Sequence, residues 1–230
     1  RSLGWPVASV VSVAVCALVA TFVPGVAAQR ATAEGTAGGE WPTYGGDLRS
    51  TRYAPLDEIT ADNFAELEVA WRFKTDAMGP RPEFNLQATP LMVDGVLYTT
   101  AGTRRAAVAL DAGTGEMLWM HREDEGPRGE SAPRRLSGRG LAYWTDGQDA
   151  RIVYVTPGYQ MVALDAKTGM RVPGFGRDGI VDLKLDNDQE MDLVTGEVGL
   201  HAAPVIAGDV VVIGAAHLPG GIPERRNNEK

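Results

Sequence analysis

Short apolar runs separated by turn residues make up most of the chain after Trp41. Val, Leu, Ile and Tyr fill these runs, and dipeptides typical of tight turns interrupt them at close intervals. Asp94-Gly95 splits PLMV from VLYTT, Pro157-Gly158 splits RIVYVT from YQMVALD, and Gly208-Asp209 splits PVIA from VVVIGAA. Two-residue turns match the twist of paired strands. The pattern therefore predicts three β-hairpins and an all-β fold.

A second kind of turn occurs twice, in ALDAGTGEMLW at 109–119 and in ALDAKTG at 163–169. In each, the Asp at the strand end can bond the backbone of the turn, and Gly can take a positive φ. The two aspartates, Asp111 and Asp165, lie 54 positions apart. The first unit contains the strands PLMV, VLYTT, AAVALD and EMLWMH; the second begins at RIVYV, and PVIAGDVVVIGAA opens a third. Four strands per unit at such a spacing are typical of propeller blades.

Two further elements are expected before the first hairpin. Residues 60–67 (TADNFAEL) predict a short helix with Phe64 and Leu67 on one face, and residues 68–76 (EVAWRFKTD) predict a strand that holds Trp71. In a propeller, long connections gather at the ends of the blades and carry function. The long connections here are 85–90, 126–140 and 175–200.

The first residues of the chain predict export. One Arg precedes an apolar run at 7–23, and Val26-Ala27-Ala28 ends in small residues that suit cleavage before Gln29. Residues 1–28 are therefore a signal peptide or a retained membrane anchor, since the run approaches a membrane span in length. Both alternatives place the rest of the chain in the periplasm. Residues 29–40 are small and polar and predict a flexible leader.

Charge and cysteine content narrow the function classes. The formal charge of -8 and the pI near 4.9 exclude nucleic acid as a partner, because no stretch supplies the basic patch that phosphates need. The one cysteine, Cys16, lies in the N-terminal apolar run, so the rest of the chain has no disulfide. No nucleophile triad, phosphate-binding loop or zinc pattern occurs, and the glycines at 113 and 115 fall in a β-turn.

Three segments carry a family resemblance. They are residues 41–71, the A-x-D-x-x-T-G-x-x-x-W pattern from Ala109 to Trp119, and LSGRGLAYW at 136–144. Together they resemble the pyrroloquinoline quinone (PQQ) dependent quinoprotein dehydrogenases, in particular the glucose dehydrogenase-like members. The resemblance implies that residues 41–230 are the N-terminal blades of an eight-bladed quinoprotein β-propeller with tryptophan-docking repeats. The later blades would follow residue 230.

The docking repeat is expected to be structural. Trp119 should fill a blade interface without touching a ligand, because burying its large flat ring contributes several kcal/mol of stability, roughly 2–4. The second repeat departs from the pattern, since Pro173 stands where the docking Trp is expected. Phe175 would then substitute as the aromatic plug.

The resemblance also implies a cofactor site. PQQ is a flat quinone with three carboxylates, so guanidinium, amide and imidazole donors suit it. Arg139, between two glycines, matches the family's cofactor-contacting arginine; Gln87 and His201 fall where the family places polar groups beside the cofactor. The alternatives are a solvated loop arginine, a plain strand-edge glutamine and a structural or surface histidine. No metal ligand can be assigned, although the family implies a divalent cation, expected to be calcium.

The function that the resemblance implies is oxidation of a sugar or alcohol by hydride transfer to PQQ. Electrons would pass to a respiratory quinone or a cytochrome, and the catalytic Asp would lie after residue 230. The stretch SAPRRLSGRG lacks the adjacent cysteines of alcohol-oxidising members, which favours a glucose dehydrogenase-like member. Residues 186–192 (DNDQEMD) lack calcium-loop spacing and read as a solvated acidic loop. The rival function is a propeller of the same repeats that acts as an envelope scaffold without a cofactor.

Overall fold

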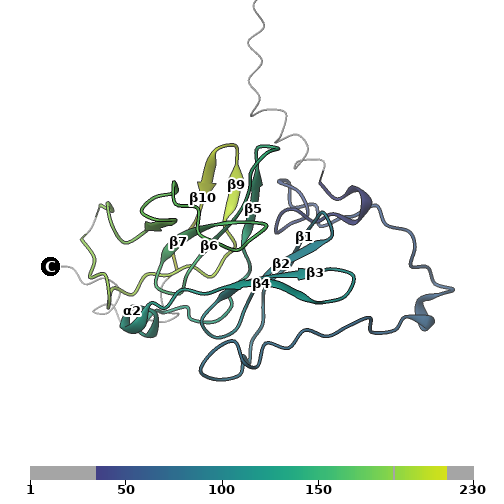
Figure 1. The fold of residues 1–230 in the computed structure, drawn as a ribbon, viewed down its shortest axis with the longest axis horizontal. Coiled ribbons are helices and arrows are strands. Elements are labelled where there is room, and N and C mark those ends of the chain that lie inside the picture. Colours follow the sequence, from purple (N-terminus) through teal and green to yellow (C-terminus); the bar gives the residue numbers. More distant parts are fainter. Residues whose placement is uncertain (1–34, 189, 217–230) are drawn as a thin grey trace, which may run out of the picture.

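Antiparallel sheets form most of the regular structure in the computed structural model, which describes residues 35–188 and 190–216. The first sheet contains, in order, β1 (Leu91–Val93), β2 (Val96–Ala101), β3 (Ala106–Asp111) and β4 (Met117–His121). The second contains β5 (Ala142–Thr145), β6 (Ala150–Val155), β7 (Gln160–Asp165) and β8 (Ile180–Asp182). A third unit is the hairpin of β9 (Val205–Ala207) and β10 (Val210–Val212). Neighbours in sequence pair with each other throughout, as expected for propeller blades (Figure 1).

The predicted hairpins are confirmed at all three positions. At the β1–β2 turn, Asp94 and Gly95 both have positive φ, 49° and 78°, which is the backbone that a tight hairpin requires. At the β9–β10 turn, Gly208 has a φ of 70°. The register of both hairpins follows directly from these two-residue connections.

The β6–β7 turn is longer than the sequence predicts. Four residues, 156–159, separate the strands, and the positive φ of 68° belongs to Tyr159 rather than to Gly158. The Thr156 amide donates to the Gln160 carbonyl at 2.8 Å, and the Thr156 hydroxyl accepts from the Gln160 amide at 3.0 Å. These bonds close a wider loop, so the prediction of a two-residue turn at Pro157-Gly158 is wrong.

The second sheet begins earlier than predicted. Its first strand is β5, which begins two residues after the GRG sequence, whereas the sequence pattern places the start of the unit at the RIVYV run of β6. β5 pairs with β6 through Ala142↔Val153 to Thr145↔Ala150. The strand is short and follows a loop motif without a break, so no turn signal marks its start.

The two Asp-containing turns fold alike. Asp111 Oδ1 accepts hydrogen bonds from the Thr114 amide at 2.8 Å and from its hydroxyl at 2.9 Å. Asp165 makes the same pair of bonds to Thr168 at 2.8 and 2.7 Å. The aspartates therefore close the β3–β4 turn and the turn after β7 in the way that the sequence predicts.

The blades stack through Trp119, which is confirmed as an interface residue. Its ring is 9% exposed and lies over Gly169, where an added Cβ would come within 2.6 Å of the indole. Its Nε1 donates to the Ala166 carbonyl at 2.9 Å. Gly169 has a φ of 69°, so the turn needs glycine both for its backbone and for the room that it leaves the tryptophan. Phe175, further along, lies half-buried in a cavity between the second sheet and the β9–β10 hairpin.

Trp71 makes the same contact one unit earlier. Its Nε1 donates to the Ala112 carbonyl at 3.0 Å, and its indole lies over Gly115, where a Cβ would come within 2.5 Å. The predicted strand at 68–76 is absent, because no described segment lies beside it to pair with. Extended backbone becomes a strand only when a neighbour accepts and donates its hydrogen bonds. The segment is held instead by the docked indole.

The predicted helix at 60–67 is also wrong. Only one 3-10 turn forms, η2 (Phe64–Glu66), on a long excursion away from the sheets (Figure 1). Phe64 is 67% exposed and Leu67 53% exposed, so the apolar face that would stabilise a helix packs against nothing described. The other short helices are η1 (Ala37–Gly39) and α2 (Gly126–Ser131), and the sequence analysis missed α2 inside the connection 126–140.

The core is layered. The largest cluster lies between the two four-stranded sheets, and both outer faces of this pair carry smaller clusters. The first outer face packs on Trp71 and Phe73, and the second on the segment that leads to β9. Members of the central cluster are Leu91, Tyr98, Ala107, Ala109, Trp119, Leu141, Ile152, Tyr154, Val162 and Leu164. Both sheets therefore carry apolar clusters on both faces, as propeller blades do, although the outer face of β4 leaves Leu118 and Met120 exposed.

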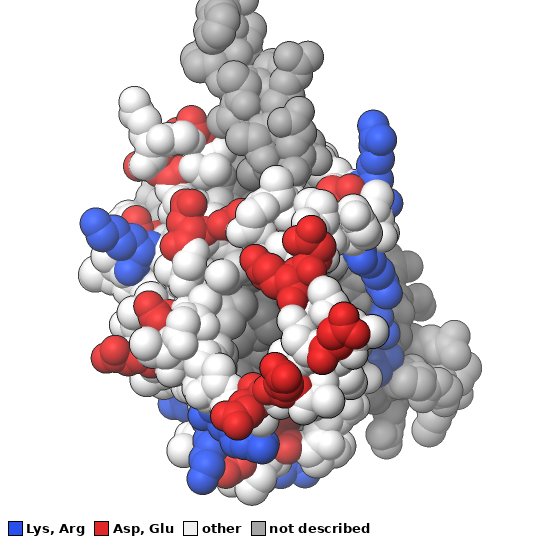
Figure 2. All heavy atoms as spheres, turned by 90° about the vertical axis from the view of Figure 1, so that its right-hand side faces the viewer, with Lys and Arg blue, Asp and Glu red and all other residues white. Residues whose placement is uncertain are grey.

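The face that carries the 51–70 excursion is predominantly acidic (Figure 2). Five exposed carboxylates come from that segment: Asp57, Glu58, Asp62, Glu66 and Glu68. This surface agrees with the net charge of -8. Among residues 35–188 and 190–216, no helix has the length and apolar content of a membrane span. The expected signal peptide or anchor at 1–28 lies outside the described residues.

Candidate functional site

Three segments far apart in the chain meet at Gln87, Arg139 and His201. His201 Nε2 and Gln87 Oε1 lie 2.5 Å apart in a hydrogen bond, and the Arg139 amide donates to the His201 carbonyl at 2.9 Å. The Thr89 amide donates to the Arg139 carbonyl at 3.0 Å and so completes the link to the Gln87 segment. All three residues that the sequence analysis singled out thus lie together.

The three residues occupy equivalent places in successive units. Gln87 lies four residues before β1, Arg139 three before β5 and His201 four before β9. Each connection enters the first strand of its sheet from the same end, so the repeat itself carries these side chains to one point. The sequence contained this signal, because every site residue stands just ahead of an apolar run.

Glycines let the Arg139 loop pack closely on its neighbours. Gly140 has a φ of 132°, and a Cβ there would lie 3.0 Å from the Thr89 carbonyl oxygen. Gly138 has a φ of 71°, and a Cβ there would lie 3.0 Å from Nε of Arg105. The close approach that these glycines permit is therefore to other protein segments, while the Arg139 side chain between them is exposed.

The site is electropositive although the chain as a whole is acidic. Burial lowers the pKa of His201, and the charges of Arg105, Arg134 and Arg139 lower it further. Its imidazole is therefore neutral near pH 7. Because the Gln87 oxygen can only accept, the hydrogen bond puts the imidazole proton on Nε2. An exposed guanidinium, an exposed amide and positive potential together suit a ligand with several carboxylates.

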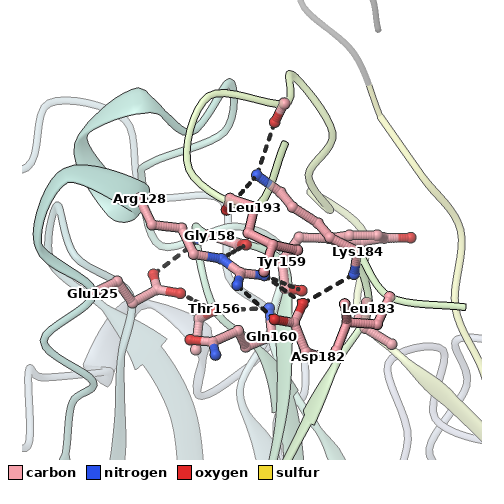
Figure 3. Close-up of polar contacts among 12 residues, drawn as sticks. Glu125, Arg128, Thr156, Gly158, Tyr159, Gln160, Asp182, Leu183, Lys184 and Leu193 are labelled. Carbon is pink, nitrogen blue, oxygen red and sulfur yellow. Dashed lines mark hydrogen bonds and ion pairs between the residues drawn. The ribbon is translucent and has the colours of Figure 1, made fainter. Parts of the chain in front are cut away.

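A polar network fixes the two connections that lead to Arg139 and His201 (Figure 3). Arg128, on α2, binds Asp182 at the end of β8 through two bonds of 2.7 and 2.6 Å. Lys184 is 3% exposed and donates to the carbonyls of Leu193 at 3.3 Å and Gly196 at 2.8 Å. α2 precedes the Arg139 loop and residues 184–196 precede His201, so this network restricts both.

Glu125 anchors the same network to the β6–β7 turn (Figure 3). Its carboxylate accepts from the Thr156 hydroxyl at 2.6 Å and from the Gly158 amide at 2.9 Å. Burial raises the pKa of Glu125 above its ordinary value. The bonds to Thr156 and Gly158 and the charges of Arg128 and Arg105 oppose that rise.

No metal site is visible among residues 35–188 and 190–216, where no three His, Cys, Asp or Glu side chains gather around one point. The acidic residues Asp186, Asp188 and Asp192 are exposed. Asp192 caps its own turn by accepting from the Val194 and Thr195 amides at 2.9 and 2.7 Å. His217 and the residues after it lie outside the described part of the chain.

Four-stranded meanders stacked through docked tryptophans define a β-propeller domain of the quinoprotein type. Residues 41–228 match the family described as PQQ: glucose/ethanol/alcohol dehydrogenase, β-propeller domain. The chain belongs to this family.

Relatives of known activity are alcohol and polyol dehydrogenases. The chain is 32% identical over 209 residues to the glycerol dehydrogenase large subunit of Gluconobacter thailandicus, covering 86% of this chain and 27% of that protein. It is 35% identical over 178 residues to 1-butanol dehydrogenase (cytochrome c) of Thauera butanivorans, covering 76% of this chain and 22% of that protein. The chain thus spans about a quarter of the length of these curated relatives.

A solved structure supports the fold. The chain superposes on the quinohemoprotein alcohol dehydrogenase ADHIIG of Pseudomonas putida HK5 with a TM-score of 0.60 and 28% identity. The match covers 83% of this chain and 24% of that structure. The propeller fold and the PQQ family are therefore shown, while the number of blades and the preference for glucose that the sequence analysis expected stay predictions.

Proposed function

We propose that the complete protein containing this chain is a PQQ-dependent dehydrogenase that oxidises CH–OH groups, and that Gln87, Arg139 and His201 contact its cofactor. One observation carries the proposal: the three residues expected to bind PQQ lie together. The side chains of Gln87 and His201 are hydrogen-bonded to each other, and the Arg139 backbone is hydrogen-bonded to the His201 backbone. Their positive surroundings suit a ligand with three carboxylates, and membership of the family supplies the identity of that ligand.

When bound, PQQ supplies a quinone that accepts a hydride from the carbon bearing the hydroxyl group. The Arg139 guanidinium would bind a cofactor carboxylate or quinone oxygen through two parallel bonds. The Gln87 oxygen holds the Nε2 proton of His201, so its amide nitrogen is left to donate toward a ligand. His201 would present its other ring nitrogen, which donates only after the imidazole takes up a proton.

Substrate, metal, acceptor and location form the finer part of the proposal. Two relatives are named as a glycerol dehydrogenase and a 1-butanol dehydrogenase. The absence of adjacent cysteines before Arg139, however, favours a glucose dehydrogenase-like member. We propose a small alcohol, polyol or aldose as substrate and calcium as the divalent cation. Electrons would pass to a respiratory quinone or cytochrome in the periplasm, with membrane attachment through residues 1–28 if that segment is retained.

Reconstitution tests this function. The complete encoded protein is incubated with PQQ and CaCl2, and dye reduction is measured with glucose, glycerol and 1-butanol, beside NAD⁺ as a control cofactor. PQQ-dependent turnover of at least one substrate is expected, and NAD⁺ should support none. Absence of both bound PQQ and turnover would rule out the enzyme and leave the scaffold function.

Replacing Arg139 tests the site. Arg139→Ala should weaken PQQ binding about 10- to 100-fold, since a hydrogen bond to a charged group contributes roughly 1.5–3 kcal/mol. Arg135→Ala is the matched control, because Arg135 is also exposed on the same connection but lines a different cleft. Equal PQQ affinity in the two variants would show that the cofactor site lies elsewhere.

A further inference from the structure

Arg105 is a buried cation, and the charge of Glu125 favours its protonated form from beyond salt-bridge distance. The residue is 3% exposed, and no Asp or Glu forms a salt bridge with it among residues 35–188 and 190–216. Burial lowers the pKa of Arg105 to about 10, so the side chain is charged at neutral pH. A buried charge destabilises the fold unless polar groups replace its water shell.

Backbone carbonyls provide that replacement. Arg105 Nε donates to the Leu136 carbonyl at 3.0 Å, and Nη2 donates to the Arg134 carbonyl at 2.8 Å. Nη1 donates to the carbonyls of Val155 at 2.9 Å and Leu200 at 2.8 Å. Four of the five N–H donors of the guanidinium are thus used, all on main-chain acceptors.

These carbonyls belong to the segments that carry the cofactor-site residues. Arg134 and Leu136 lie in the connection that leads to Arg139, and Leu200 directly precedes His201. The guanidinium also lies against Gly138, where no Cβ would fit without displacing it. One side chain from the β2–β3 turn therefore spans two connections that are separated by about sixty residues in sequence.

Glu83 links the third connection, which leads to Gln87, to the same β2–β3 turn. Its carboxylate accepts from the Gly102 amide at 2.8 Å and from the Ser137 amide at 3.2 Å. Glu83 lies on the segment that leads to Gln87. The β2–β3 turn, at 102–105, is thus bonded to all three segments that carry the candidate site.

We propose that Arg105 is the positioning residue of the cofactor site, whose guanidinium fixes the placement of the Arg139 and His201 segments relative to each other. The inference rests on the proposed function in that PQQ is taken as the ligand. The planar guanidinium has five N–H donors on three nitrogens and can therefore bridge four carbonyls. The three donors of a lysine lie on one nitrogen and cannot span the same groups. The backbone of Arg105 has a φ of 52°, a left-handed conformation that is uncommon for residues with side chains and that the four bonds help to hold.

The test compares Arg105→Met with Arg104→Met in the complete protein. Arg104 is the adjacent arginine, 40% exposed, and its one salt bridge is a 3.9 Å contact with the exposed Asp124. Two readouts are taken: PQQ affinity by equilibrium titration, and hydrogen exchange of peptides 134–140 and 199–202 without cofactor. Arg105→Met should weaken PQQ binding about tenfold or more, as loss of an orienting residue does in other bound centres. It should also speed exchange in both peptides, while Arg104→Met should stay within twofold of wild type.

Two more variants separate positioning from general loss of stability. Val162→Ala removes two methyl groups from the central core at a position on β7, outside the three connections. It should therefore lower the melting temperature but leave PQQ affinity within twofold of wild type. Arg105→Lys keeps the positive charge but replaces the planar guanidinium with a single ammonium group. This variant should fold, yet it should still bind PQQ more weakly than wild type.

Failure of this inference is distinguishable from failure of the proposed function. If wild type binds PQQ and both Arg105 variants bind it equally well, Arg105 does not position the site. If wild type binds no PQQ, the proposed function fails, and the exchange measurement still decides whether Arg105 orders the two segments. Unchanged exchange in peptides 134–140 and 199–202 would overturn the inference in either case.

Discussion

At the scale of single residues, a cluster of arginine charges around His201 distinguishes the site. Arg105 is bound to carbonyls and Arg139 is exposed, and the two, with Arg134, lower the pKa of His201. The sequence identified Gln87, Arg139 and His201 because family resemblance marks them. It gave no signal for Arg105, since an arginine next to another arginine in a turn has the pattern of a surface residue. Only the fold reveals which of the two is buried.

The lowered pKa of His201 makes a testable contribution to stability. The unfolded imidazole takes up a proton near the ordinary pKa of 6.5, whereas the folded one resists protonation. Its contribution to the free energy of unfolding is therefore complete above pH 6.5 and is lost as the pH falls below 6.5 toward the folded pKa. Between pH 7.5 and 5.5, about one pH unit on either side of that pKa, wild type should lose more stability in urea titrations than His201→Gln.

The cause of that shift is tested by removing a charge. Arg139→Ala should raise the pKa of His201 toward its ordinary value in an NMR titration of the imidazole protons. Lys167→Ala removes an equal charge from the exposed turn after β7, which is not among the causes of the shift, and should change nothing. A pKa that stays the same in both variants would contradict the electrostatic account of the site.

At the scale of elements, the Asp-x-x-Thr-Gly turn serves the neighbouring unit as well as its own. Its Asp closes the turn, its Gly adopts positive φ, and the flat space above the Gly receives a tryptophan from the preceding unit. Trp71 and Trp119 use this arrangement in the same way, each with an indole N–H bond to the alanine carbonyl of the turn. The sequence showed the turns, but Trp71 was assigned to a strand because its docking partner lies 44 residues away at Gly115.

Glycine at the docking position should be essential for stability. Gly115→Ala places a Cβ 2.5 Å from the Trp71 ring on a backbone with a φ of 74°. We expect it to lower the free energy of unfolding by about 2–4 kcal/mol, combining overpacking with the cost of positive φ. Gly113→Ala, two residues earlier, meets only the Asp111 carboxylate at 3.5 Å and should cost less than about 0.5 kcal/mol. Equal losses in chemical denaturation would refute the docking interpretation.

At the scale of the whole molecule, large apolar side chains remain exposed along the outermost elements. In the β9–β10 hairpin Val205, Val210 and Val212 are 47%, 60% and 55% exposed, and in β4 Leu118 and Met120 are 52% and 45% exposed. Both β4 and β10 also present unpaired strand edges. Surfaces of this kind are covered by neighbouring blades in a closed propeller.

Residues 1–230 produced by themselves should therefore self-associate. Light scattering coupled to size-exclusion chromatography is expected to show a mass above that of the 24.5 kDa monomer, increasing with concentration. Val210→Lys with Val212→Lys should reduce this association, because charged side chains on an edge strand oppose edge-to-edge pairing. A monodisperse monomer at high concentration would show that the exposed strands are not adhesive.

The sequence by itself determined the repeat, the hairpins and the family. Alternating apolar runs, Asp-Gly and Gly-Asp turns and the ALDA turns specify local geometry through bonds between near neighbours, so they can be read without knowing the fold. Tertiary structure alone decided the rest: that Trp71 docks, that residues 60–67 do not form a helix, and that Arg105 is buried beneath the site. Each of these depends on a partner distant in the chain, and packing and desolvation become known only when that partner is in place.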